Sequence, residues 1–336
     1  MKKSVIALAA AAALSAGVAT VANACTTLVY NNGDAAISVR TMDWYGHDDA
    51  QIVGEGKGMK HTYAQGSNAV TTKAKYASMK IVSFLPGIVA EAMNEEGLEA
   101  HLLYLGTDYT SFAEPTEAKQ DVDALQVAQW AVDNFKTVEE VVANLEKVDV
   151  VNSGVCGLPP HNDMAHCSET APVHFQFADR NGDTAVVEFV GGEMKIYRGE
   201  GTAYMSNDPE FSAHLIMDKE FTKADGSIRP YDRRLRGKTI VEDMYARDVK
   251  DATAAKNSMK AAANNVFAGY DQLDKNVGDV FPTLWTVHTD RNAGEWVFDR
   301  YDTWNVETYN FSMFDTNKPE RQPMGIHPTK VMYQGK

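Results

Sequence analysis

The chain has 336 residues, of which 44% are hydrophobic and 23% charged, and its formal net charge at pH 7 is −14. This length and composition are typical of a soluble globular protein with a sizeable core. A chain this acidic is a poor partner for nucleic acid or an anionic membrane, so we expect neither.

The first residues have the pattern of an export signal. Lys2 and Lys3 precede an apolar, alanine-rich stretch from Val5 to Val21, and Ala22-Asn23-Ala24 fits the small-x-small cleavage rule. The apolar stretch is too short and too rich in alanine for a comfortable membrane span. We therefore predict a signal peptide that is cleaved directly before Cys25.

A lipoprotein signal is the alternative, because it also leaves a cysteine at the new terminus. Such signals prefer leucine three residues before the cysteine, where this chain has Ala22. We expect a signal peptide at 1–24, a single catalytic domain at 25–336, a periplasmic or secreted location and no membrane anchor.

Cys25 would then carry a thiol nucleophile and a free α-amine on one residue. The α-amine has a reference pKa of about 7.7–8.0 and can accept the thiol proton near neutral pH. The chain has two other cysteines, Cys156 and Cys167. These two can pair in an exported protein, which leaves Cys25 as the odd and potentially reactive thiol.

The first half of the domain is predicted as strands followed by two helices. The turn Asn31-Asn32-Gly33-Asp34 joins the first two strands in a hairpin and brings Arg40 and Asp43 back towards Cys25. Residues 51–66 are predicted as a loop with weak strand character. The expected strands are Thr26–Tyr30, Ala36–Met42, Tyr76–Phe84, Ile88–Met93 and Gly97–Leu105, and the expected helices are Asp121–Phe135, from its amphipathic spacing, and Thr137–Val148, from its capping box.

The second half repeats this order after an irregular segment, Asn152–Pro172. Strands, two helices and closing strands follow, and this succession favours an αββα sandwich of two antiparallel sheets over a parallel βαβ series. The expected strands are Val173–Ala178, Thr184–Val190, Glu193–Tyr197, Ala203–Ser206, Leu284–Thr289, Gly294–Tyr301 and Asn305–Phe311, and the expected helices are Asp232–Arg247 and Asp251–Phe267.

The irregular segment contains residue types that bind zinc. They are Cys156, His161, Asp163, His166 and Cys167. Their spacing matches no common zinc pattern, and a disulfide between the two cysteines suits an oxidising compartment better. We expect no metal and no cofactor.

Five short motifs, in the same order along the chain, resemble the choloylglycine hydrolase family, which includes bile salt hydrolases and penicillin V acylases. They are Cys25-Thr26 with Arg40-x-x-Asp43, the turn Met93–Leu98, the segment Met205–Phe211, the run Asp232–Arg236 and the strand Trp285-Thr286-Val287. The resemblance implies an N-terminal-nucleophile hydrolase fold, hydrolysis of a small-molecule N-acyl amide and a homotetramer.

The resemblance also implies a role for each matching residue. Cys25 would attack the amide carbonyl and form an acyl thioester. Arg40 would favour the thiolate, and Asp43 would orient the α-amine. Asn207 would donate its side-chain amide to the oxyanion, and Arg233 would hold the cluster together or steady the transition state.

Two aromatic residues favour the penicillin V acylase branch. Tyr104 stands where bile salt hydrolases usually carry asparagine, so a backbone N–H is expected to serve the oxyanion there. Trp44 resembles the Gram-negative acylases, and together the two side chains predict an aromatic acyl pocket.

Several alternatives stay open at this point. The functional arginine could be Arg233, Arg234 or Arg236, because Arg234 replaces the family's usual phenylalanine. The substrate could be penicillin V, a conjugated bile salt or an N-acyl-homoserine lactone. A non-catalytic exported binding protein is the alternative from a different class.

Overall fold

The computed structural model describes residues 25–44, 46–157, 167–269, 273–274, 279–301 and 303–324. The expected signal peptide at 1–24 and the residues His161, Asp163 and His166 lie outside this described part. Among the described residues, no helix combines the length and apolar character needed to cross a membrane.

The first of two large antiparallel sheets has six strands, and Cys25 directly precedes its second strand, β1. In spatial order its strands are β16 (Tyr204–Ser206), β1 (Thr26–Asn32), β2 (Ala35–Asp43), β19 (Thr283–Asp290), β20 (Glu295–Arg300) and β21 (Asn305–Asn310). The predicted hairpin is confirmed, since β1 and β2 pair with Thr26 opposite Thr41 and Asn32 opposite Ala35.

The second large sheet has eight strands, also paired antiparallel. Its spatial order is β15 (Glu193–Arg198), β14 (Thr184–Val190), β13 (Val173–Ala178), β8 (Glu99–Tyr104), β7 (Val89–Asn94), β6 (Ser78–Val82), β3 (Gln51–Glu55) and β22 (Arg321–Met324). The stretch predicted as a loop from residue 51 thus begins with a regular strand, β3, because both of its edges find partners in β6 and β22.

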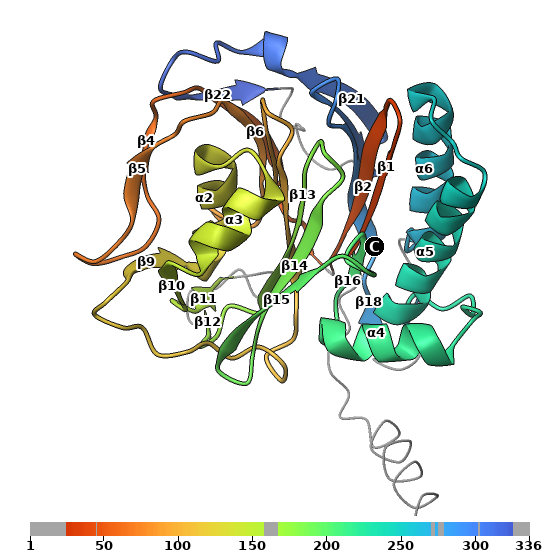
Figure 1. The fold of residues 1–336 in the computed structure, drawn as a ribbon, viewed down its shortest axis with the longest axis horizontal. Helices are drawn as coiled ribbons and strands as arrows, with labels where there is room; N and C mark the ends of the chain where they lie inside the picture. Colours follow the sequence, from red (N-terminus) through yellow and green to blue (C-terminus); the bar gives the residue numbers. More distant parts are fainter. Residues whose placement is uncertain are drawn as a thin grey trace, which may run out of the picture.

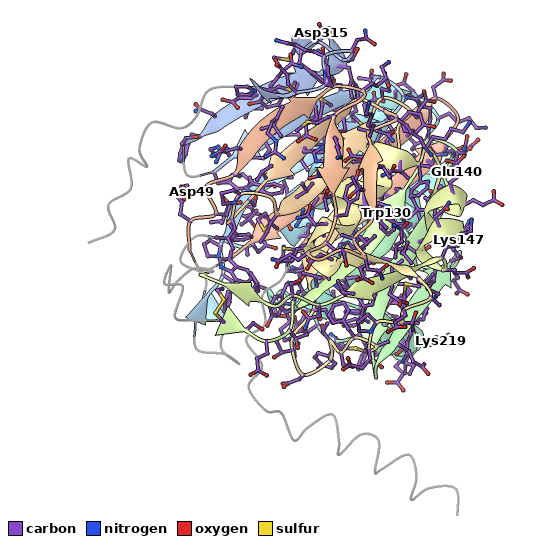
Figure 2. All side chains as sticks on the ribbon, turned by 90° about the vertical axis from the view of Figure 1, so that its left-hand side faces the viewer. Asp49, Trp130, Glu140, Lys147, Lys219 and Asp315 are labelled. Atoms are coloured by element: carbon purple, nitrogen blue, oxygen red, sulfur yellow. A yellow bond between two sulfur atoms is a disulfide. The ribbon has the colours of Figure 1, made fainter. Side chains whose placement is uncertain are left out.

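Helices cover the outer face of each sheet (Figure 1), which confirms the predicted αββα sandwich. The helices α2 (Val127–Asn134) and α3 (Val138–Leu145) pack on the eight-stranded sheet, and α5 (Pro230–Ala246) and α6 (Ala252–Val266) pack on the six-stranded sheet. A further helix, α4, spans Phe211–Glu220. In Figure 2 its residue Lys219 lies towards the lower end of the molecule, and Asp315, near the end of the described chain, lies at the top.

Apolar clusters fill all three spaces between the layers, and the middle one surrounds the thiol. Cys25 belongs to the cluster between the two sheets, together with Met42, Met79, Trp285 and Phe298. The remaining clusters lie beneath α2 and α3 and beneath α5 and α6. The nucleophile therefore starts from a water-poor environment.

The helix predicted from Asp121 begins later than expected. Residues Gln120–Asp123 form a strand, β9, which pairs in parallel with β10 (Val148–Val151), and the short 3-10 helix η1 (Ala124–Gln126) leads into α2. The same pairing ends the next helix at Leu145, before the predicted Val148. Sequence periodicity missed this because the pairing joins segments that lie far apart along the chain.

The capping box predicted at the start of the next helix, α3, is confirmed. The hydroxyl of Thr137 accepts the backbone N–H of Glu140 at 3.2 Å, and the Glu140 carboxylate accepts that of Lys136 at 2.9 Å. Helix α4 was not predicted, because its sequence has little amphipathic periodicity.

The remaining short elements are small hairpins and one 3-10 helix. They are β4 (Lys60–Thr62), β5 (Thr71–Lys73), β11 (Val155–Cys156), β12 (Cys167–Ser168), β17 (Leu273–Asp274), β18 (Asp279–Val280) and η2 (Phe311–Met313). A disulfide joins Cys156 to Cys167 across the β11–β12 pair, as the sequence led us to expect.

Candidate active site

The register of three neighbouring strands determines the surroundings of Cys25. Thr26 lies opposite Thr41 of β2 and opposite Ser206 of β16, so Cys25 lies between the ends of these two strands. The hydroxyl of Ser206 donates a 2.8 Å hydrogen bond to the carbonyl of Cys25. Asn207, the next residue after β16, therefore lies beside Cys25 in the strand register.

Arg40 extends from the six-stranded sheet to the eight-stranded sheet. Its guanidinium donates to the carbonyl of Ala90, to that of Leu102 at 2.7 Å and to the carboxylate of Glu91 at 3.3 Å. Its other face lies over the Trp285 ring, 5.1 Å from the centroid. These contacts fix the cation beside Cys25.

Glu91 and His101, which the sequence did not single out, support this arginine. Both side chains are buried, and His101 Nδ1 lies 2.8 Å from the Glu91 carboxylate. Because β7 and β8 are adjacent, Glu91 faces His101 in the strand register. No local motif marks either residue, since each acts through a partner distant in sequence.

Burial and charge act in opposite directions on the Cys25 thiol. Burial is the larger effect and raises the pKa of Cys25, while the Arg40 cation lowers it. The Asp43 carboxylate raises the thiol pKa, but the backbone N–H of Asp43 lowers it by hydrogen bonding to sulfur. The thiol of Cys25 therefore keeps its proton to a higher pH than a free cysteine does, and Arg40 reduces this increase in pKa.

Asp43 and Arg233 form a buried ion pair next to this group. Arg233 Nη2 lies 2.6 Å from Asp43 Oδ2 and 2.9 Å from the hydroxyl of Thr41. Thr283 donates to the other carboxylate oxygen. Burial raises the pKa of Asp43, while Arg233 and these hydrogen bonds lower it.

This pair identifies the arginine that belongs to the site. Arg234 instead pairs with Asp218 and donates to the carbonyl of Tyr204 at 3.1 Å. Arg236 donates to the carbonyl of Asn265 at 2.8 Å, on the exposed side of α5. Of the three candidates, only Arg233 contacts Asp43.

Asn207 is fully buried and is held by helix α4, which the sequence did not predict. His214 Nε2 donates to the Asn207 carbonyl at 2.9 Å. Burial and the nearby Arg234 lower the pKa of His214 to about 3, so the ring is neutral at physiological pH. A neutral donor fixes this backbone without adding charge near the thiol.

Asp208 joins the Asn207 segment to the segment that follows Tyr104. Its Oδ1 accepts the backbone N–H of Gly106 at 2.7 Å. Burial raises the pKa of Asp208 to about 7, opposed by the Gly106 hydrogen bond and assisted by Asp108. The sequence does not single out Asp208, because the contact joins two segments that are distant along the chain.

A cavity opens onto Cys25. Trp44 and Tyr104 line it as predicted, with ring centroids 5.8 Å apart, and Phe84 lies 5.2 Å from Trp44 in an edge-on contact. The other lining residues are Arg40, Met42, Ile88, Leu102, Leu125, Val155, Pro172 and Val173. The cavity is thus aromatic and aliphatic, with one cation at the nucleophile.

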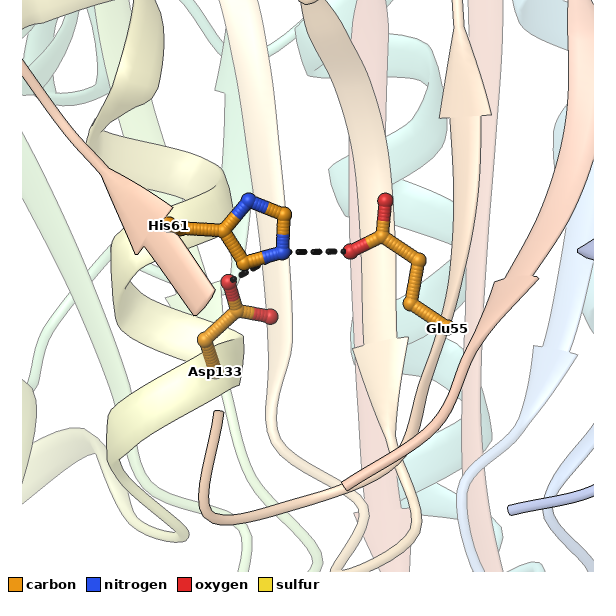
Figure 3. Close-up of side chains that lie close together, drawn as sticks. All are labelled: Glu55, His61 and Asp133. Carbon is orange, nitrogen blue, oxygen red and sulfur yellow. Dashed lines mark ion pairs between the residues drawn. The ribbon is translucent and has the colours of Figure 1, made fainter. Parts of the chain in front are cut away.

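Two groups of described residues bring potential metal ligands together, and protein cations already balance both. Glu55, His61 and Asp133 form the first, with His61 Nε2 2.9 Å from Glu55 and 3.7 Å from Asp133 (Figure 3). Lys80 contacts both carboxylates, at 2.9 Å for Asp133, and Arg321 contacts Glu55. This arrangement links the β4–β5 hairpin to α2 and fits an ion-pair network better than a metal site.

The second group lies between the large sheets. Glu91, Glu99 and His101 are close enough for their ligand atoms to share an ion. Arg40 pairs with Glu91 at 3.3 Å and Arg291 with Glu99 at 2.7 Å, so each carboxylate already has a counter-ion. Neither group offers open carboxylates of the kind that hold a metal.

Proteins similar in sequence to this chain include a penicillin V acylase and a bile salt hydrolase/transferase. The penicillin V acylase of Pectobacterium atrosepticum is 25% identical over 98% of this chain and 90% of its own length. The bile salt hydrolase/transferase of Lactiplantibacillus plantarum is 28% identical over 70% of this chain and 77% of its own length.

Solved structures share the fold. The penicillin V acylase from Agrobacterium tumefaciens matches with a TM-score of 0.77 at 24% identity, covering 91% of this chain and 94% of its own. A mutant of the conjugated bile acid hydrolase from Clostridium perfringens matches with a TM-score of 0.73 at 17% identity, covering 90% of this chain and 97% of its own. The chain therefore shares the fold of these two enzymes.

The family described as "Linear amide C-N hydrolases, choloylglycine hydrolase family" matches residues 25–321. This match spans most of the chain and both sheets, and it begins at the cysteine on which the site is centred. The chain therefore belongs to the choloylglycine hydrolase family, and it hydrolyses linear amide bonds.

Proposed function

We propose that this protein is an exported penicillin V acylase-type amidase, which releases an aryl or fatty acyl group from a small amine. The observation that carries the proposal is the aromatic cavity beside Cys25, lined by Trp44, Phe84 and Tyr104. Such a cavity suits a phenoxyacetyl group or an acyl chain. The likeness to the Pectobacterium acylase over nearly the whole chain supports the same substrate class.

The proposed reaction assigns one role to each of the residues around Cys25. Cys25 attacks the amide carbonyl, its α-amine carries the proton to the leaving amine, and water then releases the acid from the thioester. Arg40 stabilises the thiolate, and Asp43 orients the α-amine while Arg233 holds Asp43. Asn207 and a backbone N–H near Tyr104 bind the oxyanion, where losing one donor costs roughly 100- to 1,000-fold in rate.

Export and assembly are part of the same proposal. Cleavage of residues 1–24 would expose the α-amine of Cys25 and place the enzyme in the periplasm or outside the cell, without a propeptide. The disulfide between Cys156 and Cys167 suits an oxidising compartment. We also propose a homotetramer, on the family resemblance; the intact mass and the solution mass of the purified protein test both points.

The deciding experiment is amine release from penicillin V and glycocholate, assayed in parallel with the purified mature protein. Release from penicillin V, and its loss in a folded Cys25→Ser variant, is the expected result. Dominant release from glycocholate would contradict the specificity assigned to the aromatic cavity. Release from neither, with mass confirming a free Cys25 terminus, would shift the proposed substrate to N-acyl-homoserine lactones.

A further inference from the structure

Asp48 is buried on a loop whose neighbouring residues are exposed. Asp48 is 2% exposed, while His47 and Asp49 on either side face solvent. Figure 2 places Asp49 at the margin of the molecule, and its φ of 49° lets the chain turn sharply beside Asp48. A buried carboxylate is costly unless hydrogen-bond donors surround it, so the partners of Asp48 indicate its role.

Those partners come from three segments of the chain. Asp48 Oδ2 accepts the indole N–H of Trp285 at 2.6 Å and the hydroxyl of Ser83 at 2.9 Å, and Oδ1 accepts the backbone N–H of Ala50 at 3.3 Å. Within the described residues, no cation pairs with Asp48. One carboxylate thus joins its own loop to β19 and to the loop between β6 and β7.

The backbone of Asp48 also holds Phe84, which forms part of the cavity wall. The N–H of Phe84 donates to the Asp48 carbonyl at 2.6 Å. Phe84 has a φ of 66°, a left-handed conformation that is unfavourable for a bulky side chain and persists only where the surroundings enforce it. In this conformation its ring lines the cavity and lies 5.2 Å from Trp44.

The indole of Trp285, which donates to Asp48, also contacts Arg40 beside Cys25. Trp285 lies against the guanidinium of Arg40, 5.1 Å from centroid to Cζ. Asp48 therefore connects the wall of the cavity to the base of the site. The position of Phe84 depends on Asp48 more strongly than the position of Arg40 does. Arg40 is also held by three hydrogen-bond acceptors that do not involve Asp48.

We propose that Asp48 is a positioning residue that sets acyl selectivity by holding Phe84 in the cavity wall. This inference rests on the proposed function, in which the acyl group occupies the cavity. With the Asp48 contacts in place, Phe84 stays in its left-handed conformation and the cavity favours a compact aromatic acyl group. Without them, the loop relaxes, the ring leaves the wall and longer flexible chains gain room.

The test compares Asp48→Asn with Phe84→Gly and with a matched control. Asp179 is also buried, and its carboxylate accepts the backbone N–H groups of Val138 and Asn181, both at 2.9 Å, on a loop away from the cavity. Asp179→Asn thus disturbs a buried carboxylate of the same kind without touching the cavity wall.

Two readouts are measured on each purified mature variant. The first is kcat and KM for penicillin V. The second is the Kd for phenoxyacetate and for decanoate, measured by calorimetry, which requires no turnover. The rate of Cys25 alkylation by iodoacetamide checks that the nucleophile is undisturbed.

For Asp48→Asn and Phe84→Gly we expect KM and the phenoxyacetate Kd to rise about tenfold, the size of one lost aromatic contact. We expect kcat and the alkylation rate to change less than about threefold, and selectivity to shift towards decanoate. Asp179→Asn should show no shift in selectivity.

Equal selectivity shifts in Asp48→Asn and Asp179→Asn would overturn the proposal, as would a loss of kcat and alkylation without a change in KM or Kd. If Asp48→Asn does not fold, Ser83→Ala removes one donor to the same carboxylate and should shift selectivity in the same direction. A wild-type protein that binds neither acid would refute the inference. One that binds phenoxyacetate selectively but leaves penicillin V intact would refute only the proposed substrate.

Discussion

The thiol of Cys25 lies in an apolar core, and one cation compensates for that burial. Burial raises the pKa of Cys25, and Arg40 is the first counteracting influence. Arg40 is fixed by contacts to both sheets, so its charge is held at a constant position relative to sulfur. Reactivity at Cys25 should therefore report directly on this arginine.

We predict that Arg40→Gln shifts the iodoacetamide alkylation profile of Cys25 to higher pH. Each unit of increase in thiol pKa slows alkylation about tenfold at a pH below both values. Arg291→Gln is the matched control, because Arg291 is an equally buried arginine paired with Glu99. The control should lose comparable stability with an unchanged midpoint, and equal shifts in the two variants would contradict the prediction.

The carboxyl of Asp208 gives a second prediction at the residue scale. Burial raises its pKa from an ordinary 3.8 to about 7 in the folded protein. Between these values the folded state keeps a proton that the unfolded state releases, so Asp208 makes stability fall as pH rises from about 4 to 7. An asparagine side chain cannot ionise, so the Asp208→Asn variant should lack this loss.

The difference in unfolding free energy between Asp208→Asn and wild type should therefore grow in favour of the variant as pH rises. Its upper limit is about 4 kcal/mol, since each pKa unit corresponds to about 1.4 kcal/mol. Urea unfolding at pH 4.5, 6 and 8 measures it. A difference that stays constant over this range would show that Asp208 titrates normally.

At the scale of elements, helix α5 carries Arg233 to Asp43 and must pack closely on β1. Gly237 makes this approach possible, because a Cβ there would lie 2.6 Å from Cδ2 of Leu28. We predict that Gly237→Ala separates α5 from β1 and lowers the unfolding free energy by about 1–3 kcal/mol, and that it also reduces activity through Arg233.

Gly226→Ala is the control for this prediction. A Cβ at Gly226 meets nothing within 4 Å, and its backbone is not in the left-handed region. It should leave stability and activity nearly unchanged. Thermal unfolding and amine release on both variants would distinguish the cases, and a Gly237→Ala protein as active and stable as wild type would refute the close-packing argument.

The elements that could be predicted from the sequence are those defined by local chemistry. The Asn31–Asp34 turn and the Thr137 cap correctly predicted a hairpin and a helix start. The hairpin in turn placed Arg40 and Asp43 near Cys25. The resemblance to the family motifs predicted Asn207 and Arg233 as site residues, although both lie far from Cys25 along the chain.

The supporting residues could not be predicted in this way. Asp48 contacts Trp285, 237 residues away, and His214 holds Asn207 from a helix with little amphipathic pattern. Glu91 reaches Arg40 only because two sheets face each other. Such contacts depend on the packing of whole layers, which no local pattern encodes.

At the scale of the molecule, buried charge connects the two sheets across an apolar interface. Arg291, which follows β19, pairs with Glu99 of β8 at 2.7 Å, and Ser38 of β2 donates to the same carboxylate. Both charged side chains are fully buried. The pair aligns the two sheets. Because water cannot reach either side chain, each buried charge is stabilised only while its counter-ion is present.

We predict that Glu99→Leu or Arg291→Met alone lowers the unfolding free energy by about 3–5 kcal/mol, since each leaves one buried charge without its counter-ion. The double variant replaces both charges with apolar side chains and should cost less than either single change. Asp243→Asn breaks the exposed pair with Arg247 and should cost at most about 1 kcal/mol. Urea unfolding of the four variants measures these costs. If the cost of the double variant equals the sum of the single costs, the two charges act independently and the sheets are aligned by apolar packing alone.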